Sequence, residues 1–263
     1  MLMTRRLAGL MLVAAVLARS TFAPGTPSVA AAVQGDLPVP FKVGETLTYD
    51  VSWSTYLTAG TATMSVKERR PAGAGAFSYD FVAEGKPGSL LDKLYHVYYK
   101  AESLLGTRMF QPSVATMFSD ERGRTKLRTT RFVGPVGIEV EPKTGAPKEK
   151  HAVPKGTLDP LSAVYVIRAV PVKSGQVITM PVVDNGDVYT VRWQVSGPEP
   201  IATAIGTLQA WRLVPALTDD KGKPVSKYKM TLWLSDDARR LPLKFQAGLP
   251  VGSFTLTLAK IGP

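Results

Sequence analysis

The segment around residue 125 carries an alternation of basic side chains that is suited to anion binding. Its bases occupy every second position, at Arg122, Arg124, Lys126 and Arg128. On an extended strand such residues share one face and lie about 6–7 Å apart, so they would form a positively charged stripe. A stripe of this kind binds phosphate or carboxylate groups, with an affinity that falls as salt rises. The pattern is equally typical of a solvated face or an edge strand protected from aggregation by charge, and the sequence leaves these interpretations open.

Two tryptophans are the second group of candidate binding residues. Trp211 and Trp233 lie in strand-like segments, but each falls out of phase with the more apolar face of its strand. Either both faces of these strands are covered, or a hydrophobic groove opens beside them. The sequence therefore assigns six ligand-binding residues: Arg122, Arg124, Lys126, Arg128, Trp211 and Trp233.

Paired carboxylates occur at Asp219–Asp220 and at Asp236–Asp237. Neighbouring residues of a strand point to opposite faces, so neither pair can converge as a general acid and a general base. Each pair is more typical of a turn, in which aspartate accepts hydrogen bonds from nearby backbone N–H groups.

Other catalytic and cofactor signals are missing from the sequence. The chain has no cysteine and only two histidines, His96 and His151, which excludes thiolate metal sites and makes a His-based metal cage a poor fit. His96 would need an orienting acid and a nucleophile to act as a general base. The sequence contains neither a Gly-x-Ser-x-Gly elbow nor a Gly-rich phosphate loop. We therefore expect a protein that is not an enzyme and that needs no metal or cofactor.

The first 32 residues have the features of a secretory signal peptide. Two arginines precede twelve mainly apolar residues, Leu7–Ala18, a stretch shorter than the roughly 20 residues that span a bilayer as a helix. Small residues at Ala30–Ala32 fit a cleavage site. We predict a signal peptide over residues 1–32, a single exported domain over residues 33–263, and a periplasmic location.

The net charge of the whole chain is +11, from 32 Lys and Arg against 21 Asp and Glu. Three of these bases and none of the acids lie in residues 1–32, so the remainder carries +8. A basic protein in the periplasm meets anionic lipid headgroups, lipopolysaccharide phosphates and cell-wall polymers. Nucleic acid is not an expected partner, because no aromatic residues for base stacking interleave with the bases of the stripe.

Beyond Gly44 the sequence is dominated by a period-two alternation of apolar and polar residues. Examples are Leu47–Trp53, Tyr189–Val195 and Phe254–Leu258. This pattern is typical of antiparallel sheet with one covered face, and the Asn-Gly pair within Asp184–Asp187 predicts a two-residue hairpin turn. We count roughly ten to twelve short strands. The predicted fold is mainly β: a strongly curved antiparallel sheet, or an incomplete barrel, with one packed helix.

One strong helix signal interrupts the strands. Asp159 is a good N-cap, Pro160 suits the first helical position, and Pro171 ends the segment. Apolar residues at three- and four-residue spacing predict a helix that is buried on one side against the sheet. A second helix, of a single turn, is predicted over Ser89–Leu94, and the Lys-, Pro- and Gly-rich segment Pro142–Gly156 is predicted as a loop within one domain.

Several short segments carry a resemblance to a known family. They are spread over residues 39–261, in the family's order and spacing: Phe41–Tyr49, Ala59–Ala62, Asp92–Tyr95, Asp159–Ala163, Leu232–Asp236, Arg240–Pro242 and Gly252–Ser253. On these segments the chain resembles the secreted bacterial proteins grouped as domain of unknown function 3108. The resemblance implies an exported, β-rich protein, and it carries over no reaction and no catalytic residue. The chain departs from the family at residues 97–99, where Val-Tyr-Tyr stands in place of the more usual charged residues.

Together these inferences predict a protein of the bacterial envelope. Its expected function is non-enzymatic binding of an anionic or amphipathic component (lipid, lipopolysaccharide or cell-wall polymer), with contact at the membrane surface. The basic stripe and a concave apolar face would form the binding surface, by analogy of fold with periplasmic lipid and lipoprotein carriers. The alternative is a structural or assembly factor that binds another envelope protein through an exposed sheet edge. A cell-wall hydrolase is a third hypothesis that no motif supports.

Overall fold

The computed structural model describes residues 38–54, 57–72, 76–94, 96–142, 144–225, 229–249 and 252–263. The predicted signal peptide, residues 1–32, lies outside the described residues. In the described part, neither helix is long and apolar enough to cross a lipid bilayer. The strands are β1 (Thr46–Trp53), β2 (Leu57–Pro71), β3 (Phe77–Pro87), β4 (Val97–Gly106), β5 (Gln111–Glu121), β6 (Arg124–Val133), β7 (Val136–Val140), β8 (Pro147–Ala152), β9 (Val177–Asp184), β10 (Asp187–Thr203), β11 (Gly206–Thr218), β12 (Lys229–Ser235), β13 (Pro242–Leu249) and β14 (Gly252–Gly262).

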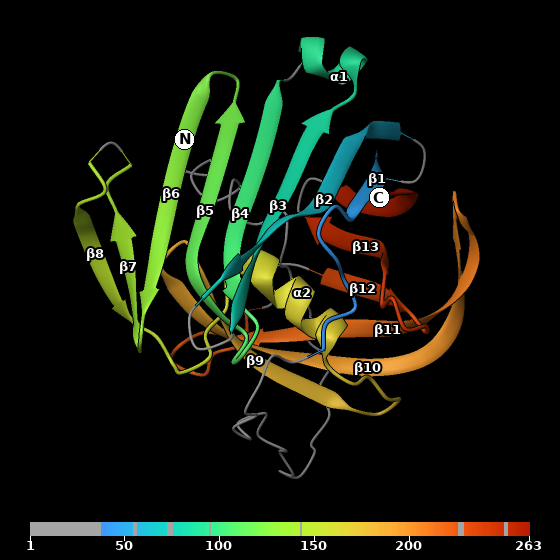
Figure 1. Cartoon of the computed structure of the whole chain (residues 1–263). Helices are drawn as coiled ribbons and strands as arrows, with labels where there is room; N and C mark the ends of the chain where they lie inside the picture. The colour runs from blue at the N-terminus through green and yellow to red at the C-terminus, as the bar shows by residue number, and fades with distance from the viewer. Residues whose placement is uncertain are drawn as a thin grey trace.

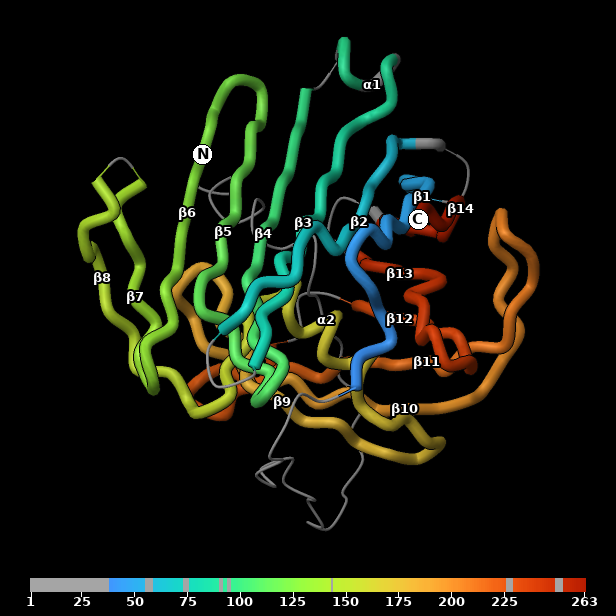
Figure 2. Tube along the Cα trace, in the orientation of Figure 1, coloured from blue at the N-terminus to red at the C-terminus, as the bar shows by residue number. Residues whose placement is uncertain are grey.

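These fourteen strands form one antiparallel sheet that is not closed into a barrel, in the order β8-β7-β6-β5-β4-β3-β2-β1-β14-β13-β12-β11-β10-β9. Strands β1–β8 make one meander and β9–β14 make a second. The two meanders are joined by the pairing of β1 with β14, in which Val51 lies opposite Leu256 (Figure 2). The first and last strands therefore lie side by side in the middle of the sheet, and β8 and β9 are its edges.

Helix α2 (Pro160–Ala169) connects the two edge strands and lies inside the curl of the sheet (Figure 1). Its N-cap, Asp159, accepts hydrogen bonds from the backbone N–H groups of Leu161 and Ser162, each at 3.0 Å. Pro160 occupies the first turn, as the sequence predicts. Residues 160–168 are all buried, so the prediction of burial on one side is wrong. The sheet curls far enough to cover every face of the helix.

The helix packs into an aromatic core. The ring of Tyr165 stacks on Phe81 of β3 with centroids 3.6 Å apart, and Phe41 contacts both rings edge-on. Leucines from both meanders, including Leu47, Leu213 and Leu232, are fully buried in the same cluster. Side chains around α2 therefore fill the inside of the curl.

The structure confirms the predicted fold class, with its strongly curved open sheet and packed helix. The short helix α1 (Ser89–Leu94) and the hairpin turn at Asn185 and Gly186, with φ of 53° and 82°, are confirmed as well. The predicted number of strands, ten to twelve, is lower than the fourteen in the described structure. The segment Pro142–Gly156, predicted as a loop, contains strand β8. This strand has no apolar face because it is the sheet edge, where proline and lysine are typical.

Candidate functional site

The predicted basic stripe lies on β6 and on the turn that precedes it. Arg122 and Gly123 form the two-residue turn between β5 and β6, with φ of 56° and 77°. Arg124, Lys126 and Arg128 follow at alternate positions of β6. The structure thus brings three of the four bases onto one face and places Arg122 at the tip of the hairpin.

This face is the one that turns toward α2. Arg128 lies opposite Met117 of β5, and both side chains line a cavity together with Asp159 and Pro160 at the start of α2. Lys126, two residues nearer the hairpin tip, is exposed. The stripe therefore runs from solvent at the tip to the interior at Arg128.

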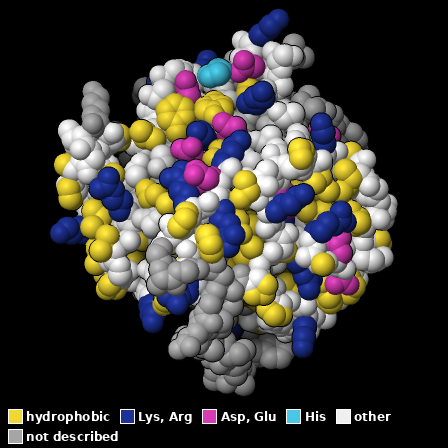
Figure 3. Space-filling view, in the orientation of Figure 1, with side chains coloured by type: hydrophobic (Ala, Val, Ile, Leu, Met, Phe, Trp, Pro, Cys, Tyr) yellow, Lys and Arg dark blue, Asp and Glu magenta, His cyan; other side chains and the backbone are white. Residues whose placement is uncertain are grey.

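The basic half of β6 is also a free edge in the described structure. β6 pairs with β5 from Arg124 to Arg131, but its pairing with β7 covers only Thr129–Val133. The charged-edge interpretation therefore stays open beside the anion-binding one. Among the described residues, Arg124 and Lys126 form no ion pair. On the face of the molecule shown in Figure 3, Lys and Arg side chains are spread among hydrophobic and acidic ones rather than gathered into one patch.

The inner end of the stripe reaches a cavity of about 40 Å³. The cavity lies between β4–β6, the start of α2 and the β9–β10 turn, and Asp184 at the end of β9 lines it. Burial raises the pKa of Asp184 to about 7, and the positive charge of Arg128 limits this rise. A carboxyl group that changes charge near neutral pH therefore faces the stripe.

A second group of charges lies beside Arg128, on β7 and β8. Glu139 and Glu149 are directly opposite each other across these strands, and His151 follows Glu149 two residues later on the same face. His151 Nε2 is 3.7 Å from Glu139 Oε1 and 3.9 Å from Glu149 Oε2. Arg128 Nη1 is 3.5 Å from Glu139 Oε1. The sequence analysis missed this group, because only the pairing of β7 with β8 brings its members together and β8 was predicted as a loop.

The hydrogen bonding of this group is incomplete. Both His151 Nε2 and Arg128 Nη1 are buried, and neither has a hydrogen-bond partner among the described residues. The turn at Asn185 and Gly186 packs against the same side chains: a Cβ atom on Gly186 would be 3.0 Å from His151 Nε2 and 3.1 Å from Glu139 Oε1. This turn belongs to the opposite edge of the sheet, so the contact links the two edges.

The start of α2 is anchored by a buried carboxylate. Besides two backbone N–H groups, Asp159 accepts hydrogen bonds from the hydroxyls of Ser103 and Ser162, at 2.6 and 2.5 Å. Burial raises the pKa of Asp159, and its hydrogen bonds partly offset the increase. With four donors on one carboxylate, the group ties the helix to β4 and has little capacity left for a ligand.

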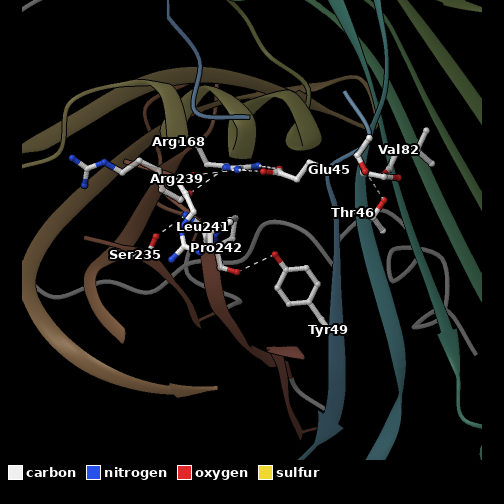
Figure 4. Close-up of polar contacts among 12 residues, drawn as sticks. Glu45, Thr46, Tyr49, Val82, Arg168, Ser235, Arg239, Leu241 and Pro242 are labelled. Atoms are coloured by element: carbon white, nitrogen blue, oxygen red, sulfur yellow. Dashed lines mark hydrogen bonds and ion pairs between the residues drawn. The ribbon is translucent and has the colours of Figure 1, made fainter. Parts of the chain in front are cut away.

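The end of α2 is held by a buried ion pair that the sequence analysis missed. Arg168 donates hydrogen bonds to both carboxylate oxygens of Glu45, at 2.7 and 3.0 Å, and two more to backbone carbonyls of the β12–β13 turn (Figure 4). The hydroxyl of Tyr49 donates to the carbonyl of Pro242 nearby, at 2.9 Å. Glu45, Tyr49 and Pro242 all come from segments that carry the family resemblance. Those segments therefore specify how the sheet holds its helix.

The two predicted tryptophans lie on β11 and β12, in the other meander from β6. Trp233 is 7% exposed; its indole N–H donates to Glu199 at 2.5 Å, and the ammonium of Lys244 lies 5.1 Å from the ring centre. Trp211 is half-buried, and its indole N–H donates to Asp236 at 2.7 Å. Trp233 lies on the face of β12 opposite the buried Leu232 and Leu234, and both faces are covered there. Trp211 lies opposite Leu234 and alternates with Leu213, so it is on the core-facing side of β11, and the prediction that it is out of phase is wrong. The structure does not bring the two tryptophans together with the basic stripe, and a ligand-binding role for them stays a prediction.

A larger cleft, of about 240 Å³, lies on the face of β4 and β5 that turns away from α2. Here Asp92 supplies the orienting acid that the sequence did not reveal, with Oδ1 2.7 Å from His96 Nδ1. His96 Nε2 faces a second carboxylate, that of Asp120, at 3.9 Å. The described residues that line the cleft are Lys86, Pro87, Asp92, His96, Val97, Tyr98, Phe118 and Asp120. None of these is a serine, threonine or cysteine.

The fold defines a class of protein: an open, β-barrel-like sheet curled around one helix. A crystal structure of this class, the beta-barrel-like protein of domain of unknown function DUF1849 from Brucella abortus, is similar with a TM-score of 0.51 and 12% identity. The match covers 84% of this chain and 97% of that one, and at this identity it concerns the fold alone. A Bacteroides fragilis protein described as exported, with a YmcC-like fold, aligns at 9% identity and a TM-score of 0.32, over 86% and 99% of the two chains.

The chain belongs to the family described as protein of unknown function DUF3108, whose match covers residues 48–259. This confirms the resemblance seen in the sequence. No curated protein matches the chain.

Proposed function

We propose that the protein is exported to the bacterial envelope and binds an anionic envelope component without catalysis. The contacts are charge-assisted hydrogen bonds from Arg124 and Lys126 to phosphate or carboxylate groups. Support for export comes from the N-terminal sequence pattern. Support for binding comes from one observation above all: two exposed cations without ion-pair partners in the described structure share a face at a free sheet edge.

The filled interior favours binding at the surface over enclosure of a lipid chain. Small-molecule pockets usually have volumes of about 300–1,000 Å³, whereas the cavity beside α2 measures about 40 Å³. We therefore place the ligand's charged groups along the β5–β6 hairpin, and Arg128 at the inner limit of the contact. Electrostatic attraction of the basic protein to a polyanion would bring the two together.

The test compares residues 33–263 with a variant that carries Arg124→Glu and Lys126→Glu. Binding is measured by co-sedimentation with vesicles of phosphatidylglycerol and phosphatidylcholine, and by titration with lipopolysaccharide, so that the two sources of phosphate are distinguished. We expect a loss of affinity of at least tenfold in the variant, with an unchanged melting temperature.

A matched control reverses two lysines at the same spacing on the edge strand β8, Lys148→Glu and Lys150→Glu. It changes the net charge equally but alters exposed residues of β8. We expect it to retain most of the binding. Equal losses of affinity in the two variants would mean that only net charge matters, and would contradict a site on β6. If the unmodified protein bound none of the anionic probes, the proposed function itself would be contradicted.

A further inference from the structure

We propose that Glu139, Glu149 and His151 form a binding site for a first-row divalent cation of the zinc type. The three side chains share one face of two paired strands, and each offers one donor atom; these atoms lie within 4.8 Å of one another. This site was not expected from the sequence, in which the three residues have no metal-binding spacing.

The register of β7 and β8 places two negative charges side by side, where a positive charge would be stabilising. Like charges that lie directly opposite each other in an antiparallel pair destabilise it, yet Glu139 and Glu149 are direct partners. The side chain of Glu139 is 10% exposed, so water screens its charge poorly. A cation held between the two carboxylates would remove their repulsion.

The donor set suits zinc. Imidazole nitrogen and carboxylate oxygen are both common zinc ligands, with bond lengths of about 2.0–2.2 Å, which places neighbouring donors about 3.3 Å apart in a tetrahedral site. The distances from His151 Nε2 to the two glutamates are 3.7 and 3.9 Å, and all three donor atoms lie within 4.8 Å of one another, so the side chains would have to draw together to reach a zinc ion. The buried Nε2 lacks a hydrogen-bond partner among the described residues, which leaves its lone pair free in the neutral ring. Three protein ligands leave a fourth position for water or for a ligand.

The surroundings supply an outer shell for such a site. Carboxylates that bind metals are usually held by further hydrogen-bond donors. Arg128 Nη1 lies 3.5 Å from Glu139 Oε1 as a charge contact without a hydrogen bond, close enough to become such a donor. Gly186 gives the turn room to pack beside the donors, since any side chain there would approach His151 and Glu139 closely. The exposed side chain of Glu149, on the edge strand, opens the path from solvent.

The experiment is a calorimetric titration of zinc into residues 33–263, freed of any histidine tag and treated with a chelator. We expect one zinc per chain, a micromolar or tighter Kd, and a higher melting temperature with zinc. His151→Gln and Glu149→Gln should each weaken binding at least tenfold. Because protons compete with the metal for its ligands, affinity should fall as the pH is lowered.

The chain offers matched controls. His96→Gln removes the other histidine, which also lies between two carboxylates, and Glu68→Gln removes a glutamate of similar exposure on β2. Both variants should bind zinc as the unmodified protein does. Loss of binding in His96→Gln with retention in His151→Gln would overturn the assignment. So would the absence of zinc binding tighter than 100 µM. Neither result bears on vesicle binding through Arg124 and Lys126.

Discussion

Gly186 lies against the imidazole of His151, so close that a Cβ atom at position 186 would be 3.0 Å from both Cε1 and Nε2 of the ring. The two residues belong to opposite ends of the sheet: His151 to edge strand β8, and Gly186 to the turn between β9 and β10. The open sheet is therefore bridged at this point by side-chain and backbone packing instead of strand pairing.

Gly186→Ala should loosen this bridge. The left-handed φ of 82° costs a non-glycine residue about 1–2 kcal/mol, and the new methyl group would add about 1–3 kcal/mol by overpacking against His151. Gly222→Ala is the control, because it has a similar φ of 75° and open space around it. Urea unfolding should show a larger loss for Gly186→Ala. Equal losses would mean that the contact contributes nothing beyond backbone strain.

Removal of one partner from the buried pair of Glu45 and Arg168 should be strongly destabilising. Arg168→Met leaves a buried carboxylate without its two hydrogen bonds, at a cost of about 3–5 kcal/mol. The exposed Arg70, which pairs with Glu68 and Asp80, provides the comparison, and Arg70→Met should cost about 0–1 kcal/mol. The free energy of unfolding measures both. A loss below 1 kcal/mol for Arg168→Met would contradict an anchoring role.

Stability should decrease between pH 4 and pH 7 because of Asp184. The carboxyl of an unfolded aspartate titrates near pH 3.9, whereas the pKa in the folded protein is raised to about 7. Between these values the folded protein keeps a proton that the unfolded chain has released, so the contribution of Asp184 to stability is fully present below pH 4 and is lost as the pH rises through 7.

Asp184→Asn should remove this dependence. Relative to the unmodified protein, the variant should gain up to about 4 kcal/mol between pH 4 and pH 8. Asp187→Asn, at the exposed end of the same turn, should show no such gain. Unfolding free energies in denaturant at the two pH values measure the effect, and parallel pH profiles for Asp184→Asn and the unmodified protein would refute it.

Vesicle binding should be sensitive to salt if it depends on the exposed Arg124 and Lys126. The Debye length shrinks from about 10 Å at 0.1 M salt to about 3 Å at 1 M, so affinity for phosphatidylglycerol vesicles should fall at least tenfold over this range. Co-sedimentation in sodium chloride measures it, with phosphatidylcholine vesicles as the reference. Binding that is unaffected by salt would indicate an apolar contact instead.

Local sequence signals predicted the features that depend on neighbouring residues. Asp159 and Pro160 start α2, and Asn185 and Gly186 make the predicted turn, because capping and a positive φ are decided within a few residues. Alternation of apolar residues likewise predicted the curved sheet, since one covered face per strand needs only period-two spacing.

Features that depend on distant pairing were not predictable in this way. Glu45 and Arg168 are 123 residues apart, and no local pattern marks them as partners. Glu139 meets Glu149 only through the register of β7 and β8, and β8 carries no apolar face from which to predict a strand. Of the candidate binding residues, three bases share a predicted face, whereas the tryptophans lie in the other meander.

The pairing of β1 with β14 has a consequence for the order of folding. Each meander can form from contacts between neighbouring strands, but their junction joins Thr46 to Gly262, a contact that requires almost the entire described chain. Non-local contacts of this kind form late and slow folding. Until β14 has paired, β1 keeps one unpaired side, and such a side can pair with the wrong chain. Strand β14 therefore completes the sheet last, and its deletion should leave two separate half-sheets prone to aggregation.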